Sequence, residues 1–159
     1  MRTLIGFTST YGTAEECAKL LAAQLVGEVD VINLAKEQPD PGDYDRIILG
    51  GSIYMGQIQK ANKSYCETHS QQLLQKPLGL YICSGRQGDE AAAQWQAAFP
   101  TALLEHAQWV NTLGYRYNLQ RMSFLHRMIV KKLAKVTQDQ DALDRGSIQS
   151  LAAAMESCS

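Results

Sequence analysis

The sequence predicts an α/β fold in which a five-stranded parallel sheet is covered on both faces by helices. Five short apolar runs alternate along the chain with segments whose apolar residues recur at helical spacing. Such alternation is typical of parallel strands joined by right-handed crossovers. Several runs are continuous, as expected of strands buried on both faces. The 159 residues hold no internal repeat, so we expect a single domain over residues 1–159.

The N-terminal run Arg2 to Phe7 is apolar and ends in a polar turn, after which residues 14–26 show helical spacing. This order predicts a strand, a loop and a helix. Further strands are expected at 29–34, 46–50, 78–83 and 109–113, and further helices at 60–75, 90–106, 122–136 and 147–155. Within 90–106, Pro100 ends one helical segment because it has no N–H to donate.

The composition is that of a globular chain, with 45% hydrophobic and 19% charged residues. Apolar runs are far shorter than the roughly 20 residues that cross a bilayer, and the N-terminus shows no secretory signal pattern. We therefore expect a cytoplasmic protein. The sequence leaves its oligomeric state open, and nothing in it indicates a nucleic-acid partner.

The basic residues are unevenly distributed. Residues 115–135 hold six of the 15 lysines and arginines and no acidic residue, although the net charge of the whole chain is −1. The basic stretch Arg116 to Lys135 includes an apolar stripe, for which core packing is the default interpretation. A stripe beside this many cations also suits peripheral contact with the anionic inner face of a membrane.

The four cysteines, Cys17, Cys66, Cys83 and Cys158, form no Cys-x-x-Cys motif and pair with no histidine at metal-ligand spacing. We therefore predict no metal site and no redox dithiol, and interpret them as buried thiols or a loose C-terminal one.

Ligands of open parallel sheets bind beyond the carboxyl ends of the strands. Three known ligand-binding motifs can be sought in the loops at those ends. The first loop offers only Gly12 and lacks the glycine-rich dinucleotide pattern. The segment Gly51 to Gly56 has the glycine spacing of a loop that binds nucleoside triphosphates. It lacks the lysine and the serine or threonine that must follow in such a loop. The paired carboxylates of a phospho-acceptor domain are absent from the ends of the first and third strands. All three chemistries are thereby excluded.

The first loop is instead rich in hydroxyl groups. Thr8, Ser9, Thr10 and Thr13 surround Gly12 and lead directly into a helix. Hydroxyls and helix N-terminal amides hydrogen-bond a phosphate monoester without a cation. Ser and Thr also cap helices commonly, so this loop alone leaves both interpretations open.

The run Thr8-Ser9-Thr10-Tyr11-Gly12-Thr13 resembles the phosphate loop of the flavodoxin family, and two later loops resemble the family's flavin loops in the same order. The resemblance implies a flavodoxin-like three-layer sandwich with strand order 2-1-3-4-5 and FMN as the cofactor. It implies FMN contacts from Thr8, Ser9, Thr10, Tyr11, Gly12, Thr13, Ser52, Ile53, Tyr54, Met55, Gly56, Ser84, Gly85, Arg86 and Gly88.

Within that family the chain most closely resembles the menaquinone-dependent protoporphyrinogen IX dehydrogenase branch. The sequence segments that carry this resemblance are Tyr44 to Gly56, Gly114 to Tyr117, and the basic Phe124 to Lys132. The last of these lies in an expected helical insertion at about 114–140. The resemblance implies an FMN-dependent oxidoreductase that takes electrons from a reduced small molecule, such as protoporphyrinogen, and passes them to a quinone. No protein residue is then required as a catalytic group, because the flavin supplies the chemistry.

Two alternatives remain. One is a soluble flavodoxin that carries electrons between protein partners, and the other is a flavodoxin-like scaffold that has lost FMN. Tyr54 is expected to stack on the flavin, whereas the loop of Ser84 to Gly88 has no aromatic residue, which would leave one flavin face accessible to a substrate. Arg86 either lies near the reduced flavin or is a solvated loop residue.

Overall fold

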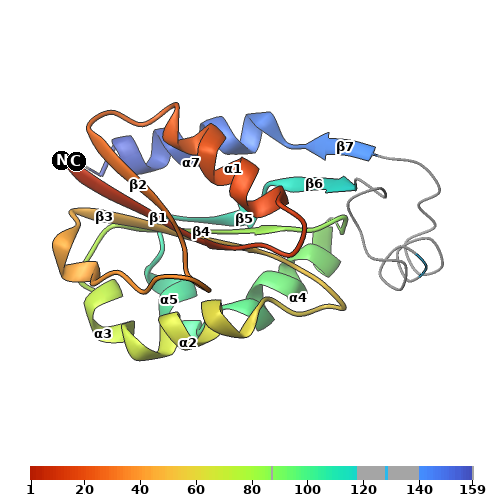
Figure 1. Cartoon of the computed structure of the whole chain (residues 1–159), viewed down its shortest axis with the longest axis horizontal. Coiled ribbons are helices and arrows are strands. Elements are labelled where there is room, and N and C mark those ends of the chain that lie inside the picture. The colour runs from red at the N-terminus through yellow and green to blue at the C-terminus, as the bar shows by residue number, and fades with distance from the viewer. Residues whose placement is uncertain (87, 118–127, 129–139, 159) are drawn as a thin grey trace.

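The computed structural model describes residues 1–86, 88–117, 128 and 140–158. Five strands form the main sheet, and most helices follow the order expected from the sequence (Figure 1). The strands are β1 (Arg2–Thr8), β2 (Glu28–Asn33), β3 (Arg46–Ser52), β4 (Leu78–Cys83), β5 (Trp109–Thr112), β6 (Gly114–Tyr117) and β7 (Gln140–Leu143). The helices are α1 (Thr13–Ala22), α2 (Lys60–Thr68), α3 (Ser70–Leu73), α4 (Gly88–Ala98), α5 (Thr101–His106) and α7 (Arg145–Glu156).

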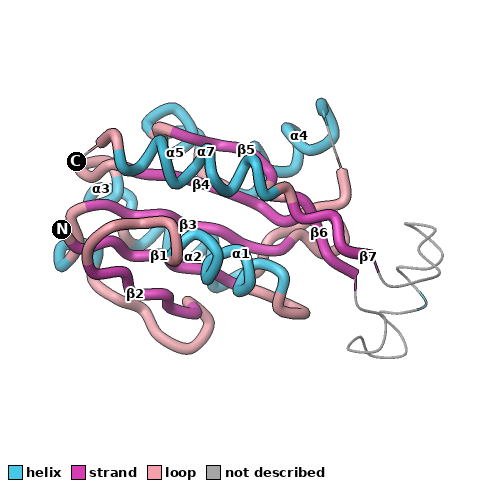
Figure 2. The backbone as a smooth tube through the Cα atoms, turned by 90° about the horizontal axis from the view of Figure 1, so that it is seen from above, coloured by secondary structure: helices cyan, strands magenta, loops and turns pink. Residues whose placement is uncertain are grey.

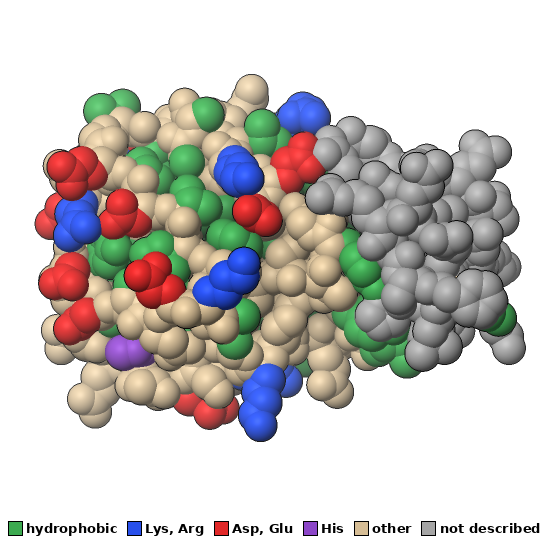
Figure 3. All heavy atoms as spheres, in the orientation of Figure 1, with side chains coloured by type: hydrophobic (Ala, Val, Ile, Leu, Met, Phe, Trp, Pro, Cys, Tyr) green, Lys and Arg blue, Asp and Glu red, His purple; other side chains and the backbone are tan. Residues whose placement is uncertain are grey.

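The main sheet is parallel throughout, with the order β2-β1-β3-β4-β5. Helices α1 and α7 cover one face, and α2, α3, α4 and α5 cover the other (Figure 1). The prediction of a three-layer α/β sandwich with strand order 2-1-3-4-5 is therefore confirmed. Both termini lie at the end of the molecule opposite the carboxyl ends of the strands, where acidic side chains are numerous on the visible face (Figure 3).

The strands alternate their side chains between two cores, one on each face. On the α1 and α7 face, the buried Tyr81 ring lies where a Cβ at Gly50 would come within 2.0 Å of it. Residue 50 must therefore be a glycine, because any side chain there would collide with the Tyr81 ring. The Tyr81 hydroxyl donates to the Ala14 carbonyl at 2.9 Å, which ties β4 to the first turn of α1.

Two local expectations differ from the structure. The single helix expected at 60–75 is divided at His69, whose φ of −109° and ψ of 18° lie outside helical geometry. No strand was expected after residue 113, yet Gln140–Leu143 pairs antiparallel with Gly114–Tyr117. This two-stranded ribbon lies beyond the carboxyl end of the main sheet (Figure 2). Most of the expected helix at 122–136 lies outside the described residues. Met128 is the one described residue in that range, and it is helical.

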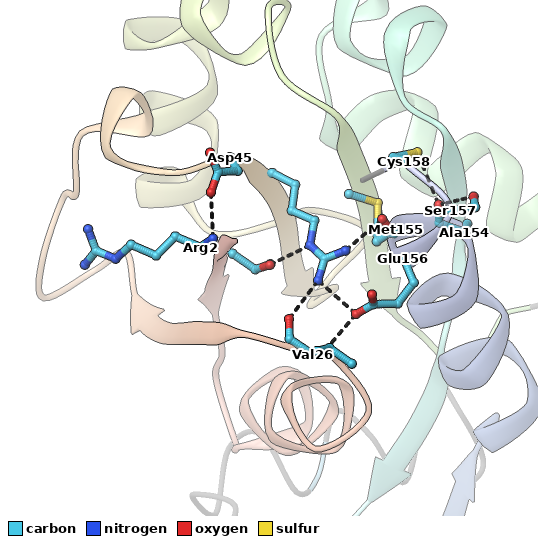
Figure 4. A network of polar contacts seen from close by, with 10 residues as sticks. Arg2, Val26, Asp45, Ala154, Met155, Glu156, Ser157 and Cys158 are labelled. Atoms are coloured by element: carbon cyan, nitrogen blue, oxygen red, sulfur yellow. Dashed lines mark hydrogen bonds and ion pairs between the residues drawn. The ribbon is translucent and has the colours of Figure 1, made fainter.

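A buried arginine joins four segments at the amino end of the sheet. The sequence pattern placed Arg46 at the start of an apolar strand, yet its side chain is only 1% exposed. Its guanidinium donates to Thr3 Oγ1 at 2.6 Å, to the Met155 carbonyl at 2.9 Å, to the Val26 carbonyl at 3.2 Å and to Glu156 Oε1 at 2.8 Å. Figure 4 shows three of the acceptor residues, Val26, Met155 and Glu156, gathered between α7 and the chain that follows α1. Four hydrogen bonds from this one buried cation are thereby accepted by oxygen atoms, which offsets the cost of burying its charge.

Glu156 completes this cluster from the last turn of α7. The hydrogen bond from Arg46, and then that from the Val26 backbone N–H, lower the pKa of the Glu156 carboxyl below its ordinary value of 4.5. A carboxyl whose pKa is lower in the folded state stabilises the fold above its unfolded pKa. That stabilisation is lost as the pH falls through the folded pKa.

We predict that Arg46→Ala lowers the free energy of unfolding by about 3 kcal/mol, because it leaves buried oxygen atoms without donors. Glu156→Gln is expected to cost about 1 kcal/mol near neutral pH, since the Glu156 side chain is one-third exposed and partly screened. Urea unfolding measures both changes.

The pH dependence provides the control. The stability difference between the parent and Glu156→Gln is expected to shrink as the pH falls below about 4.5. Glu105→Gln, at an exposed position of α5, is expected to change stability by less than about 0.5 kcal/mol. An Arg46→Ala protein as stable as the parent would contradict the role assigned to this cluster.

Candidate functional site

Three loops meet at the carboxyl-end edge of the sheet because their strands are neighbours in register. Thr8 is paired with Gly51, and Ser52 with Cys83. Loop 1 (residues 8–13) follows β1, loop 2 (residues 52–57) follows β3, and loop 3 (residues 84–86 and 88) follows β4. The structure thus brings together the three segments that the sequence nominated separately.

Loop 1 turns sharply into α1. The Gly12 N–H donates to Ser9 Oγ at 2.8 Å, and Gly12 has a φ of 94°, a conformation that favours glycine. The Thr10 side chain is exposed and that of Thr13 is half-buried, whereas Thr8 is buried beneath the loop. Loop 1 therefore presents hydroxyl and backbone N–H donors at the N-terminus of a ten-residue helix.

Two side chains at the start of α2 lie within hydrogen-bond distance of loop 1. The carboxamide of Gln59, the residue before α2, lies between Thr8 and Thr10, and its contacts depend on which way the amide is turned. Asn62 is fully buried, and its Nδ2 donates to the Gly50 carbonyl at 2.8 Å and to Thr8 Oγ1 at 3.2 Å. Thr8 is therefore fixed between loop 1 and the neighbouring strand β3.

Loop 2 contains a tight reverse turn. Tyr54 and Gln57 exchange backbone hydrogen bonds of 2.9 and 3.1 Å, with Met55 at φ 54° and Gly56 at φ 77° between them. Positive φ at both central residues defines a type I′-like turn, which is strained for a methionine. Met55 is 62% exposed at its tip, and Tyr54 is half-buried beside it. The turn thus presents an aromatic ring and a flexible thioether at the edge of the site.

The Ser52 hydroxyl oxygen, where β3 passes into loop 2, is buried and finds no hydrogen-bond partner within the described chain. Such an atom is costly unless a ligand or water satisfies it. Ser52 is therefore suited to a polar contact with a bound molecule.

Loop 3 is tied to the ribbon. The Ser84 N–H donates to the Gly114 carbonyl at 2.9 Å, and its hydroxyl contacts Gln94. The Arg86 N–H donates back to Ser84 Oγ at 3.1 Å. The exposed Arg86 guanidinium lies 3.4 Å from Glu90, one turn away, which is the weak geometry of a solvated surface pair. Positive charge at this loop is thus partly compensated.

The fold also brings together two cysteines that sequence spacing kept apart. Cys17 and Cys83 are both buried free thiols with their sulfur atoms 3.5 Å apart. The hydrogen bond with Cys17, together with burial, raises the pKa of the Cys83 thiol. Burial likewise raises the pKa of Cys66 to about 12. Cys66 and Cys83 therefore remain protonated at neutral pH, and we interpret the buried cysteines as packing residues. Among the described residues no cluster of His, Cys, Asp or Glu could hold a metal ion.

The fold and these loops define an open α/β protein with a ligand site at the carboxyl ends of β1, β3 and β4. The family described as "Flavodoxin domain" matches residues 4–144. The chain belongs to this flavodoxin family, and membership implies FMN as its cofactor.

The relatives agree with this assignment. Protoporphyrinogen IX dehydrogenase [quinone] from Escherichia coli K12 is 30% identical over 115 residues, which are 69% of this chain and 63% of that protein. The matched region therefore spans under two thirds of the relative. Crystal structures of oxidised flavodoxin 1 from Bacillus cereus (TM-score 0.56, 12% identity, 99% and 98% of the two chains) and of an NADH:FMN oxidoreductase in its apo form (TM-score 0.59, 13% identity, 100% and 91%) share the fold.

The residues present fit FMN. Loop 1 contains no lysine or arginine, so its donors for a phosphate are neutral hydroxyls and backbone N–H groups at the start of α1. The buried Ser52 hydroxyl oxygen offers a further polar contact between loops 1 and 3.

Gln59 and Asn62 were missed as site residues by the sequence analysis. Polar residues in a loop and at a helix start carry no local signal of a role in a distant loop. Only the pairing of β1 with β3 shows that they lie beneath Thr8.

We predict that Thr10→Ala and Thr13→Ala each weaken FMN binding about 10-fold or more, because each removes a hydroxyl donor from a charged phosphate. Fluorescence titration of FMN-free protein measures this. Thr10→Ser and Thr13→Ser keep the hydroxyl and are expected to bind nearly as the parent does. Unchanged affinity in both alanine variants would show that loop 1 does not hold the phosphate.

Proposed function

We propose that this chain is an FMN-dependent oxidoreductase that takes electrons from a reduced small molecule and passes them to a quinone. The observation that carries the proposal is the convergence of the hydroxyl-rich loop 1 with loops 2 and 3 at one edge of a flavodoxin sheet. The relative that is a protoporphyrinogen IX dehydrogenase supports this reaction class and makes a protoporphyrinogen-like tetrapyrrole the first donor to test.

The protein's part is to bind and orient the flavin. Bound FMN supplies the electron-transfer chemistry. Ser9, Thr10, Gly12 and Thr13 would hold its phosphate at the α1 N-terminus. Ser52, Ile53, Tyr54, Met55 and Gly56 would line one side of the ring, and Ser84, Gly85, Arg86 and Gly88 the other.

Access to the flavin differs between the two sides in this proposal. Loop 2 brings Tyr54 to the site, whereas loop 3 contributes no aromatic side chain. Stacking of one aromatic ring leaves the opposite face accessible to a planar substrate. An enzyme with a small-molecule donor requires such a face, while a carrier that exchanges electrons with protein partners does not.

Membrane contact is part of the proposal, because quinones reside in membranes. No helix in the described ranges is long and apolar enough to span a bilayer. Contact would instead be peripheral, through the basic stretch Arg116 to Lys135, most of which lies outside the described residues.

The experiment is anaerobic absorbance spectroscopy of the FMN-loaded protein. We expect protoporphyrinogen to bleach the oxidised flavin band and a menaquinone analogue to restore it. Chemically reduced protein mixed with the quinone alone is the matched control for the second half of the reaction.

A yellow protein that is not bleached by protoporphyrinogen but is reoxidised by the quinone would contradict this donor. Failure of both steps would favour an electron carrier between protein partners. A protein that takes up no FMN would favour a scaffold without cofactor.

A further inference from the structure

The Ser84 hydroxyl supports loop 3 from within the protein. Ser84 is only 7% exposed. Its hydroxyl donates to Gln94 Oε1 on α4, and its oxygen accepts from the Arg86 N–H at 3.1 Å. A serine hydroxyl has a single proton to donate. Because that proton is directed to Gln94, the Ser84 hydroxyl acts on the loop itself.

The backbone of Ser84 joins the same point to a third element. The Ser84 N–H donates to the Gly114 carbonyl at 2.9 Å, at the start of β6. Gly114 has a φ of 85°, and a Cβ there would come within 2.2 Å of the Ala142 carbonyl oxygen in β7. A glycine is therefore needed where the ribbon meets loop 3. The first residue of loop 3 is thus joined to β6 through its N–H and to α4 through its hydroxyl.

Gln94 contacts loop 3 from the second turn of α4. It is half-buried and lies ten residues after Ser84. Loop 3 connects β4 to α4, so this contact fastens the start of the loop to the helix that follows it. The hydrogen bond from the Arg86 N–H fixes the middle of the loop in the same way. Loop 3 is therefore held in place by contacts within the protein.

In the proposed site, loop 3 lies along the flavin ring and carries the positive charge of Arg86. A loop that is already ordered loses less conformational freedom when it binds a ligand. We propose that Ser84 and Gln94 are positioning residues that hold loop 3, with the Arg86 cation, beside the flavin ring. This inference rests on the proposed FMN site. It adds Gln94 to that site and gives the Ser84 hydroxyl a supporting role in place of a direct flavin contact.

The position of Arg86 links this support to the redox equilibrium of the flavin. A positive charge close to a flavin favours its reduced, anionic form. The exposed Arg86 guanidinium lies 3.4 Å from Glu90, so part of its charge is compensated. Loosening the loop is expected to let the cation move away from the ring, which lowers the midpoint potential of bound FMN.

The test removes the link without adding a charge. Ser84→Ala and Gln94→Met are each expected to weaken binding of both FMN and riboflavin about 5-fold, because a hydrogen bond that orders the loop is lost. The ratio of the two affinities is expected to stay at the parent value, since loop 3 serves the ring and not the phosphate. Gln96→Met, at an exposed position of α4, is the matched control and is expected to bind both flavins as the parent does. Fluorescence titration measures these affinities.

Two further measurements separate positioning from a general loss of stability. The double variant that carries both changes is expected to bind no more weakly than Ser84→Ala, because both changes break the same link. The midpoint potential of bound FMN, from anaerobic reductive titration, is expected to be lower in each single variant than in the parent and in Gln96→Met.

Hydrogen exchange followed by NMR tests the support in the parent protein, which needs no variant to fold. In FMN-free protein the N–H groups of Ser84 and Arg86 are expected to be protected, since both donate within the protein. In Ser84→Ala the Arg86 N–H is expected to lose its protection, whereas the N–H of residue 84 keeps it through the Gly114 carbonyl.

Several outcomes overturn the inference. Parent-like affinity for both flavins in Ser84→Ala and Gln94→Met, a fall confined to FMN, a further fall in the double variant, midpoint potentials equal to that of the parent, or an unprotected Arg86 N–H in the FMN-free parent would each do so. In those cases FMN binding by the parent protein leaves the proposed function standing. A parent protein that binds no FMN by titration would overturn the proposed function and this inference together.

Discussion

The parallel register of β1, β3 and β4 is the constraint on which the candidate site depends. Because Thr8 is beside Gly51 and Ser52 is beside Cys83, the chain leaves the three strands at the same edge. A slip of one residue in any pair would turn the side chains of that strand to the opposite face. The fit of the side chains opposes such a slip, because the Tyr81 ring occupies space that only a glycine at position 50 leaves free.

The two ends of the sheet are held by different chemistry. At the amino end, the Arg46 guanidinium and Glu156 connect β3 to α7, so a charged pair stabilises the end of the sheet opposite the site. At the carboxyl end the support consists of neutral amides and hydroxyls, namely Gln59, Asn62 and Thr8. Neutral donors suit a site for an anion, because they can be redirected to a ligand without leaving an unpaired charge.

Much of the fold could be predicted from local sequence. The apolar runs located the five strands to within about two residues, because buried parallel strands require such runs. Pro100 marked a true helix end, and the hydroxyls around Gly12 identified loop 1. These features depend on neighbouring residues and are readable in one dimension.

Features formed by distant residues were not predicted. Cys17 and Cys83, 66 residues apart, gave no motif, and Arg46 was hidden in an apolar run although its partner Glu156 lies 110 residues away. The ribbon pairs two segments of four residues each, which are too short and too mixed in composition for a pattern to mark them as strands. Gln59 gained its role only through the pairing of β1 with β3.

The central claim is that neutral donors of loop 1 hold the phosphate of FMN, and the ³¹P NMR spectrum of the bound cofactor tests it directly. Hydrogen bonds that favour the charged form lower a pKa, so the second pKa of the phosphate, about 6 when free, is expected to fall on binding. The account predicts a ³¹P resonance that stays constant between about pH 6 and 8. A bound resonance that titrates like that of free FMN would show a phosphate exposed to solvent and would contradict the account.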